Sequence, residues 1–187
     1  NDLKDLVKIP ENFEILFLQG GATSQFSMIP MNLLSENKES EYVLTGYWSK
    51  KAILEAQKFS KVHISTSGED TNFTSINPIN QWSVNPNSSY LHYTANETIE
   101  GIEFNFVPNF GSIPVISDMS SNFLSKPIDV SSHSLIYSGT QKNIGTSGLT
   151  IVIIQKDIIN SSSSSIPTMF DYNTHLKSDS RYNTPPV

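Results

Sequence analysis

The feature that most constrains the fold of this 187-residue chain is the run Leu149-Thr150-Ile151-Val152-Ile153-Ile154. It is nearly continuous in its apolar character, whereas a strand with one buried face alternates apolar and polar residues. Such a run is typical of a strand that is covered on both faces. We therefore expect residues 149–154 to form a strand in the middle of a layered sandwich.

Shorter apolar runs bounded by turn residues recur along the chain and predict further buried strands. They cover residues 13–18, 42–45, 62–65, 90–93, 115–117 and 135–137. Helical spacing separates some of these runs, most clearly at 49–60, where Ala52, Ile53, Ala56 and Phe59 share one face. Strands that alternate with helices favour an α/β domain with a largely parallel sheet.

Composition excludes several classes of function. The chain has no cysteine, so it holds no disulfide, thiolate zinc site or cysteine nucleophile. A formal net charge of −6 gives no basic footprint for nucleic acid, and no apolar run approaches the roughly 20 residues that cross a bilayer. We expect neither nucleic acid nor membrane as a partner, and a cytoplasmic location. The histidines lack metal-ligand spacing, so no metal is expected.

The first candidate site is the segment Leu18-Gln19-Gly20-Gly21-Ala22-Thr23-Ser24-Gln25, where a predicted strand runs through a glycine pair into a predicted helix. This arrangement presents backbone N–H groups and the positive end of a helix to an anion, usually a phosphate. The segment has neither a Walker A lysine nor a three-glycine dinucleotide fingerprint. A tight connection without a ligand is therefore the alternative interpretation.

Two further segments place an ionisable side chain just after a predicted strand. Lys142 lies among small residues, and a buried lysine amine shifts toward the neutral form that condenses with an aldehyde. A surface ion pair is the alternative for Lys142. Asp118 ends the strand at 115–117, at the edge where ligands collect in open α/β sheets; capping of the next helix is its alternative. Trp48, at a predicted helix start, either stacks on a planar ring or packs in the core.

Read in order, six blocks resemble the phosphoserine aminotransferase family, and they span nearly the whole chain with near-family spacing. The blocks are Phe17-Leu18-Gln19-Gly20-Gly21 with Gln25-Phe26, Pro30-Met31-Asn32-Leu33-Leu34, Gly46-Tyr47-Trp48, Asn96-Glu97-Thr98, Gln141-Lys142-Asn143-Ile144-Gly145 and Asn183-Thr184-Pro185-Pro186. The resemblance implies the large domain of fold-type I pyridoxal-phosphate enzymes, a three-layer α/β/α sandwich around a mostly parallel mixed sheet. It also implies that residues 1–187 form one cofactor-binding domain, without the N-terminal segment and the C-terminal small domain of the full protein.

The same resemblance implies a chemistry. Lys142 matches the lysine that holds pyridoxal 5′-phosphate as a Schiff base, Asp118 matches the acid that pairs with the pyridine nitrogen, and Trp48 matches the aromatic side chain that stacks on the ring. The implied reaction exchanges an amino group between phosphoserine and 2-oxoglutarate, giving 3-phosphohydroxypyruvate and glutamate, in L-serine biosynthesis. The alternatives are another aminotransferase on this scaffold, of the alanine–glyoxylate type, and a non-catalytic α/β domain that binds a phosphorylated ligand.

Further cofactor contacts also follow from the resemblance. Ala22 and Thr23 match positions whose backbone holds the cofactor phosphate, and Thr98 and Gln141 match other cofactor contacts. In some relatives an arginine that helps to bind substrate stands where this chain has Thr23, so substrate must be anchored elsewhere. Finally, Asn183 and Thr184 match residues that reach the cofactor of the neighbouring subunit, which implies a homodimer with shared sites.

Overall fold

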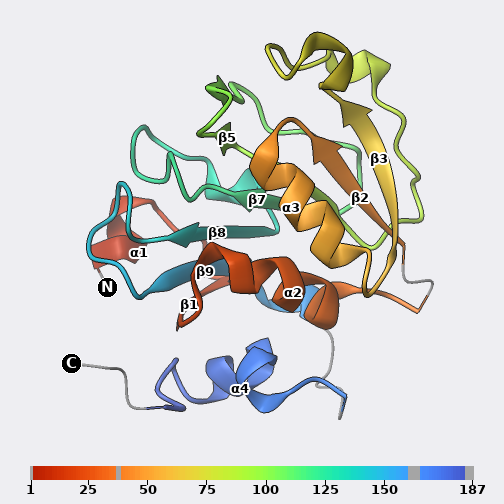
Figure 1. Ribbon diagram of the computed structural model, residues 1–187. Helices are drawn as coiled ribbons and strands as arrows, with labels where there is room; N and C mark the ends of the chain where they lie inside the picture. Colours follow the sequence, from red (N-terminus) through yellow and green to blue (C-terminus); the bar gives the residue numbers. More distant parts are fainter. Residues whose placement is uncertain (1, 37–38, 160–164, 184–187) are drawn as a thin grey trace.

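The computed structural model describes residues 2–36, 39–159 and 165–183, and a seven-stranded mixed sheet forms its centre (Figure 1). The strand order is β1-β9-β8-β7-β4-β2-β3. The bounds are β1 (Phe13–Leu18), β2 (Glu39–Leu44), β3 (Lys61–Ser67), β4 (Leu91–Thr94), β7 (Val115–Asp118), β8 (Leu135–Gly139) and β9 (Thr150–Gln155). Neighbouring strands from β8 to β3 are parallel, whereas β9 is antiparallel to both β1 and β8. The largely parallel sheet and the seven strands expected from the apolar runs are confirmed.

Strand β9 carries the apolar run that the sequence placed inside a sandwich. It pairs with β1 on one side and β8 on the other. Its side chains from Ile151 to Ile154 are at most 4% exposed. Because they alternate between the two faces of the sheet, both faces must be covered.

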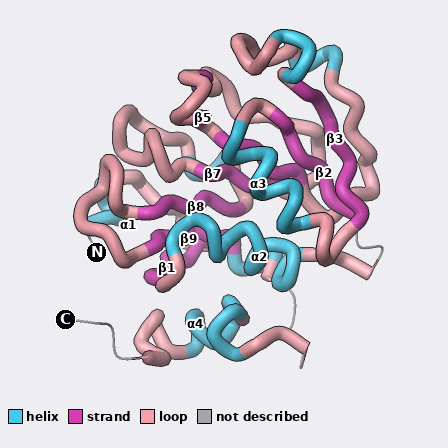
Figure 2. Tube along the Cα trace, in the orientation of Figure 1, coloured by secondary structure: helices cyan, strands magenta, loops and turns pink. Residues whose placement is uncertain are grey.

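One face of the sheet is covered by helices. Helices α2 (Gly21–Leu33) and α3 (Tyr47–Ala56) lie side by side across it, and α4 (Tyr172–Lys177) packs beside β1 (Figures 1 and 2). Phe26, Ile29 and Ile53 from these helices join the strand residues in one buried cluster. Helix α3 starts two residues before the predicted 49–60 segment and ends at Ala56, where the chain turns toward β3.

The opposite face is covered mostly by shorter elements. Its buried cluster combines Val7, just after helix α1 (Asp2–Leu6), with Trp82, Phe104 and Phe123 from the connecting segments. These segments contain the hairpin of β5 (Asn96–Glu97) and β6 (Ile102–Glu103) and the 3-10 helices η2 (Ile79–Gln81) and η3 (Val130–Ser132). Three further 3-10 helices are η1 (Glu69–Thr71), η4 (Lys156–Ile158) and η5 (Thr168–Phe170), and Ile158 of η4 packs against the buried cluster on the helix-covered face. The α/β class is confirmed, and within the described ranges the second outer layer consists of α1, the hairpin and turns. None of the described helices has the length and apolar character needed to cross a bilayer.

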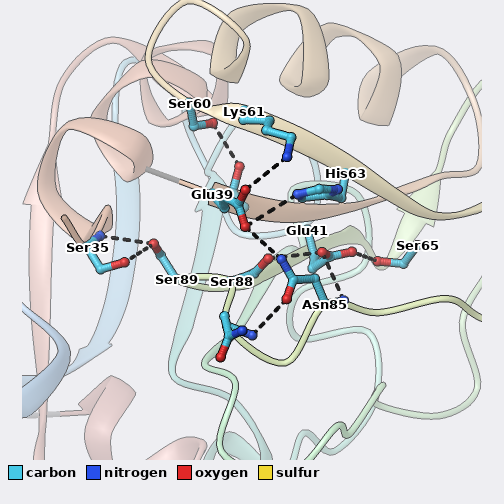
Figure 3. A network of polar contacts seen from close by, with 12 residues as sticks. Ser35, Glu39, Glu41, Ser60, Lys61, His63, Ser65, Asn85, Ser88 and Ser89 are labelled. Carbon is cyan, nitrogen blue, oxygen red and sulfur yellow. Dashed lines mark hydrogen bonds and ion pairs between the residues drawn. The ribbon is translucent and has the colours of Figure 1, made fainter. Parts of the chain in front are cut away.

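A buried polar network fastens the β2–β3 edge of the sheet (Figure 3). The Glu41 carboxylate on β2 is fully buried and accepts hydrogen bonds from Ser65 Oγ at 2.6 Å, Ser88 Oγ at 3.0 Å and Asn85 N at 3.2 Å. A buried carboxylate whose oxygens accept hydrogen bonds in this way holds a loop against a sheet. The network lies toward the amino end of β2, away from the carboxyl ends of the strands, and we interpret it as structural.

Candidate functional site

A pocket lies where the parallel strands β4, β7 and β8 end and where α2 and α3 begin. Its cavity volume is about 130 Å³. Six of the residues singled out in the sequence line it, namely Ala22, Thr23, Trp48, Asp118, Gln141 and Lys142. The carboxyl ends of parallel strands meet at one edge of a sheet, which explains why residues so distant in sequence come together here.

The start of α2 forms one wall of the pocket. Gly20 and Gly21 follow β1 with φ angles of +93° and +66°, a left-handed conformation that glycine adopts without a steric penalty. No side chain caps Gly20, and the first turn of α2 carries no acidic residue. The positive end of a 13-residue helix therefore faces the pocket at Ala22 and Thr23, as the binding of a phosphate requires.

The start of α3 forms the opposite wall, and a buried carboxylate fixes it. Glu97 on β5 accepts hydrogen bonds from the backbone N–H of Trp48 at 2.9 Å and of Ser49 at 2.8 Å, and Glu100 accepts from Tyr47 N at 2.9 Å. Burial, reinforced by the nearby Glu100 charge, raises the pKa of Glu97 above its usual value despite these hydrogen bonds. Sequence reasoning quoted Glu97 within a motif but gave it no role; its position next to Thr98 was the available signal.

Lys142 lies at the mouth of the pocket. Its Nζ donates hydrogen bonds to Thr98 Oγ1 at 2.8 Å and Ser121 Oγ at 2.7 Å, and it stands 5.8 Å from the centroid of the Trp48 ring. Of the two interpretations, the structure agrees with a lysine at the surface, because Lys142 is exposed, although its amine contacts two hydroxyl groups rather than a carboxylate. Two hydroxyl groups satisfy the amine at the protein surface, so no burial is needed to hold it. Ser121 was missed in the sequence, because its contact with Lys142 depends on the folding of the segment after β7.

Asp118 lies deeper in the pocket and is 5% exposed. One carboxylate oxygen accepts a hydrogen bond from Ser120 N at 2.9 Å, so Asp118 both stabilises the turn after β7 and lines the pocket. The segment that follows β7 is a turn and not a helix, so Asp118 does not cap a helix, and its contact with a cofactor stays a prediction. Burial raises the pKa of its carboxyl above the usual value, while the hydrogen bond from Ser120, the polarity of the Tyr137 hydroxyl and the charge of Lys142 act in the opposite direction.

The remaining predicted residues lie apart from the pocket wall. Thr98 reaches the site through its hydrogen bond to Lys142. Asn183 lines a second cavity that shares no lining residue with the pocket, and its Nδ2 lies 3.3 Å from Met169 Sδ. Thr184 lies outside the described residues. The contact of Asn183 and Thr184 with a neighbouring subunit stays a prediction.

Together the pocket offers an amine, a buried carboxylate, an indole ring and a helix start. These four groups match what pyridoxal 5′-phosphate presents, which is an aldehyde, a basic ring nitrogen, a flat aromatic face and a phosphate. The site therefore fits this cofactor by the chemistry of its donor set.

Comparison with known proteins finds aminotransferases. The family model described as aminotransferase class-V matches residues 1–187. A phosphoserine aminotransferase of Laribacter hongkongensis is 51% identical over 186 residues, which cover 100% of this chain and 52% of that protein. The chain thus spans about half the length of the curated relatives it matches.

Solved structures agree with this. A phosphoserine aminotransferase from Bacillus circulans subsp. alkalophilus has a TM-score of 0.95 at 44% identity, covering 98% of this chain and 51% of that one. A pyridoxal-phosphate-bound phosphoserine aminotransferase from Trichomonas vaginalis has a TM-score of 0.91 at 39% identity, covering 98% and 55%. Because the family model matches residues 1–187, the chain belongs to the class-V aminotransferase family.

Proposed function

We propose that the protein containing this chain is a pyridoxal-phosphate-dependent phosphoserine aminotransferase. It exchanges an amino group between phosphoserine and 2-oxoglutarate, giving 3-phosphohydroxypyruvate and glutamate, the reaction that serves L-serine biosynthesis. The observation that carries the proposal is that Lys142, Asp118 and Trp48 line one pocket at the carboxyl edge of the sheet. The names of the similar proteins support the choice of phosphoserine over other amino donors.

Each residue of the pocket has a task in this proposal. When bound, the cofactor supplies an electron sink for the pair of electrons left at the substrate Cα. Lys142 Nζ would hold the cofactor through its aldehyde group, and the free amine would carry the proton removed from that carbon. The hydroxyls of Thr98 and Ser121 keep Nζ in position for both tasks. Asp118 holds the proton on the ring nitrogen.

The walls of the pocket orient the cofactor. The backbone of Ala22 and Thr23 binds its phosphate at the start of α2, and Gln141 contacts it beside Lys142. Trp48 stacks on the ring and excludes water from one side of it. These tasks rest on the positions of the side chains around a single cavity.

We place the protein in the cytoplasm as a homodimer. Asn183 lines a cavity separate from the Lys142 pocket, as expected of a residue whose target lies on another subunit. In the dimer, Asn183 and Thr184 reach the phosphate of the neighbouring subunit's cofactor. The absence of cysteine fits a reducing compartment.

A comparison of amino donors tests the proposed substrate. The full-length protein is assayed with 2-oxoglutarate as the acceptor and either phosphoserine or serine as the donor. A further assay uses alanine as the donor and glyoxylate as the acceptor. We expect kcat/KM for phosphoserine to exceed that for serine by roughly 100-fold or more, because a site built to pair a charged group discriminates strongly against a donor that lacks it. Equal values for the two donors, or a preference for alanine with glyoxylate, would contradict the proposal.

A further inference from the structure

The motif at residues 30–34 takes no part in the pocket, but its asparagine connects α2 to the chain around α4. Asn32 lies on α2 and is 2% exposed. Its Nδ2 donates hydrogen bonds to the carbonyl oxygen one turn earlier on α2, at 2.8 Å, and to that of Phe170, at 2.7 Å. Its Oδ1 accepts a hydrogen bond from Tyr172 N at 2.9 Å. One buried amide group thus holds residues 167–183, which we call the α4 segment, against α2.

A second amide on the same face of α2 makes a further link. Gln25 precedes Asn32 by seven residues, which is two helical turns, and its Oε1 accepts a hydrogen bond from the Tyr172 hydroxyl at 2.6 Å. Gln25 and Tyr172 are both 0% exposed. Tyr172 therefore gives its backbone N–H to Asn32 and its hydroxyl to Gln25. Because breaking either contact leaves a buried polar group unsatisfied, the α4 segment has one favoured position on α2.

Hydrogen bonds within the α4 segment carry this position along to Asn183. His175 Nε2 donates to the carbonyl oxygen of Met169 at 2.9 Å, which joins α4 to the turn before it. At the end of α4, Ser180 N donates to the His175 carbonyl oxygen at 2.8 Å, and Ser180 Oγ accepts from Phe17 N on β1 at 2.9 Å. Asn183 follows three residues later, with its Nδ2 3.3 Å from Met169 Sδ. The place of Asn183 thus depends on how the segment docks.

Helix α2 therefore contacts two different parts of the proposed enzyme. Its first turn, at Ala22 and Thr23, faces the pocket of its own subunit. Its buried amide side chains hold the segment that leads to Asn183, which lines a cavity separate from that pocket. In the proposed dimer, Asn183 reaches the cofactor of the neighbouring subunit. One helix would then serve both cofactor sites, its own through the first turn and the partner's through the α4 segment.

We propose that Gln25 and Asn32 are positioning residues for the site of the neighbouring subunit, because they dock the α4 segment so that Asn183 meets the partner's cofactor phosphate. This inference rests on the proposed function, in which Asn183 reaches across the dimer. The alternative is that the docking of the α4 segment only stabilises its own subunit. The two differ in which subunit's Lys142 loses cofactor when the docking is broken.

The first test compares cofactor affinity in matched variants of the full-length enzyme. Asn32→Asp puts a carboxylate oxygen where an N–H₂ group donates to two carbonyl oxygens. We expect it to weaken pyridoxal-phosphate binding about 10-fold, a typical loss for one hydrogen bond to a charged group. Asn77→Asp is the control, since Asn77 Nδ2 also donates to two oxygens, Thr66 Oγ1 at 3.0 Å and Ser67 O at 2.9 Å, on strand β3 at the opposite edge of the sheet from β1. Equal affinities in the two variants would overturn the proposal.

The second test shows which subunit is affected, without any activity measurement. Asn32→Asp subunits are mixed with an excess of Lys142→Ala subunits, dissociated and reassociated, and reduced with borohydride at limiting cofactor. In a mixed dimer the Lys142 amine belongs to the Asn32→Asp subunit, while Asn183 comes from a partner with an intact Asn32. We expect the fraction of Lys142 that carries reduced cofactor, measured by mass spectrometry, to rise toward the wild-type value on mixing. No rise would confine the damage to the variant's own subunit and overturn the proposal.

Tyr172→Phe covers the case in which Asn32→Asp does not fold, because it keeps the buried ring and removes only the hydrogen bond to Gln25. We expect several-fold weaker cofactor binding and the same rise on mixing. Asn183→Ala, mixed in the same way, separates the two levels of the account. A rise for Asn183→Ala alone would refute the positioning role and leave the proposed function intact. No rise for any of the three variants would contradict the shared site, and the inference with it.

Discussion

At the scale of single residues, Asp118 has the most demanding task, because its negative charge must persist in a buried position. Replacing it with asparagine keeps the shape of the side chain and removes the charge. We expect Asp118→Asn to retain the cofactor and to lose turnover by about 100-fold or more, because an amide cannot keep the ring nitrogen protonated. Steady-state kinetics with visible absorbance of the bound cofactor measures both, and Asp129→Asn, which changes the cap of η3, is the control. Near-normal turnover would rule out the role assigned to Asp118.

His92 makes the stability of the fold sensitive to acid. Burial holds its pKa at about 3, against 6.5 for an exposed histidine, so between these values the unfolded state binds more protons than the folded state. The contribution of His92 is therefore complete above about pH 6.5 and is lost as the pH falls toward 3, by up to about 1.4 kcal/mol per pH unit. Urea unfolding of the wild type and of His92→Gln at pH 7.5, 6 and 5 measures how the free energy of unfolding changes with pH. The free energy of unfolding should fall less steeply with decreasing pH in His92→Gln than in the wild type. Identical slopes in the two proteins would contradict the role assigned to His92.

At the scale of secondary-structure elements, the β5 strand connects two functional residues. Glu97 fixes the start of α3 and hence Trp48, while the next residue, Thr98, holds the amine of Lys142. An amide in place of the Glu97 carboxylate turns one acceptor into an N–H₂ group that faces backbone N–H donors. We expect Glu97→Gln to cost about 1–2 kcal/mol of stability and to weaken cofactor binding several-fold.

Glu103→Gln is the matched control for this prediction, since Glu103 lies on β6 in the same hairpin and pairs with Lys126 at the surface. A surface ion pair contributes little, so its loss should leave cofactor affinity unchanged. Urea unfolding and cofactor titration measure both variants. If Glu97→Gln binds cofactor as tightly as Glu103→Gln, then Glu97 does not position Trp48 for the cofactor.

At the scale of the whole molecule, the elements that the sequence predicts are those whose buried residues recur at a short, regular spacing along the chain. Strand β9 and the helix face around Ala52 and Ile53 were predicted because burial repeats along them. Helix α4 was not predicted, since it has six residues and buries Tyr172 through a hydrogen bond to Gln25 that no local pattern reveals. The hairpin of β5 and β6, two residues a strand, was missed for the same reason.

The residues of the site likewise divide into those that the sequence predicted and those that it did not. Lys142, Asp118 and Trp48 lie in short motifs with a family resemblance, and the structure brings them to one pocket. The supporting residues Glu97 and Ser121 contact other segments of the chain, so their contacts exist only once the chain has folded. The sequence left open whether Lys142 is buried or exposed, because this depends on which groups the fold places around its amine.

Sharing of sites between subunits is tested by mixing variants. Lys142→Ala subunits have no amine for the cofactor, and Asn183→Ala subunits lack the residue proposed to reach across the interface. If Asn183 serves the partner's cofactor, a mixed dimer has one intact site, built from Lys142 of one subunit and Asn183 of the other. We expect the mixture, after dissociation and reassociation, to regain activity above that of both variants. No gain on mixing would contradict a shared site.

The central claim, that Lys142 carries pyridoxal phosphate, is tested most directly by trapping the bond. The full-length holoenzyme is reduced with borohydride and digested, and the peptides are analysed by mass spectrometry, with Lys142→Arg as the control. The account predicts loss of the visible absorbance and a reduced cofactor adduct on Lys142, absent from the variant. An unmodified Lys142, or an adduct on another lysine, would contradict it.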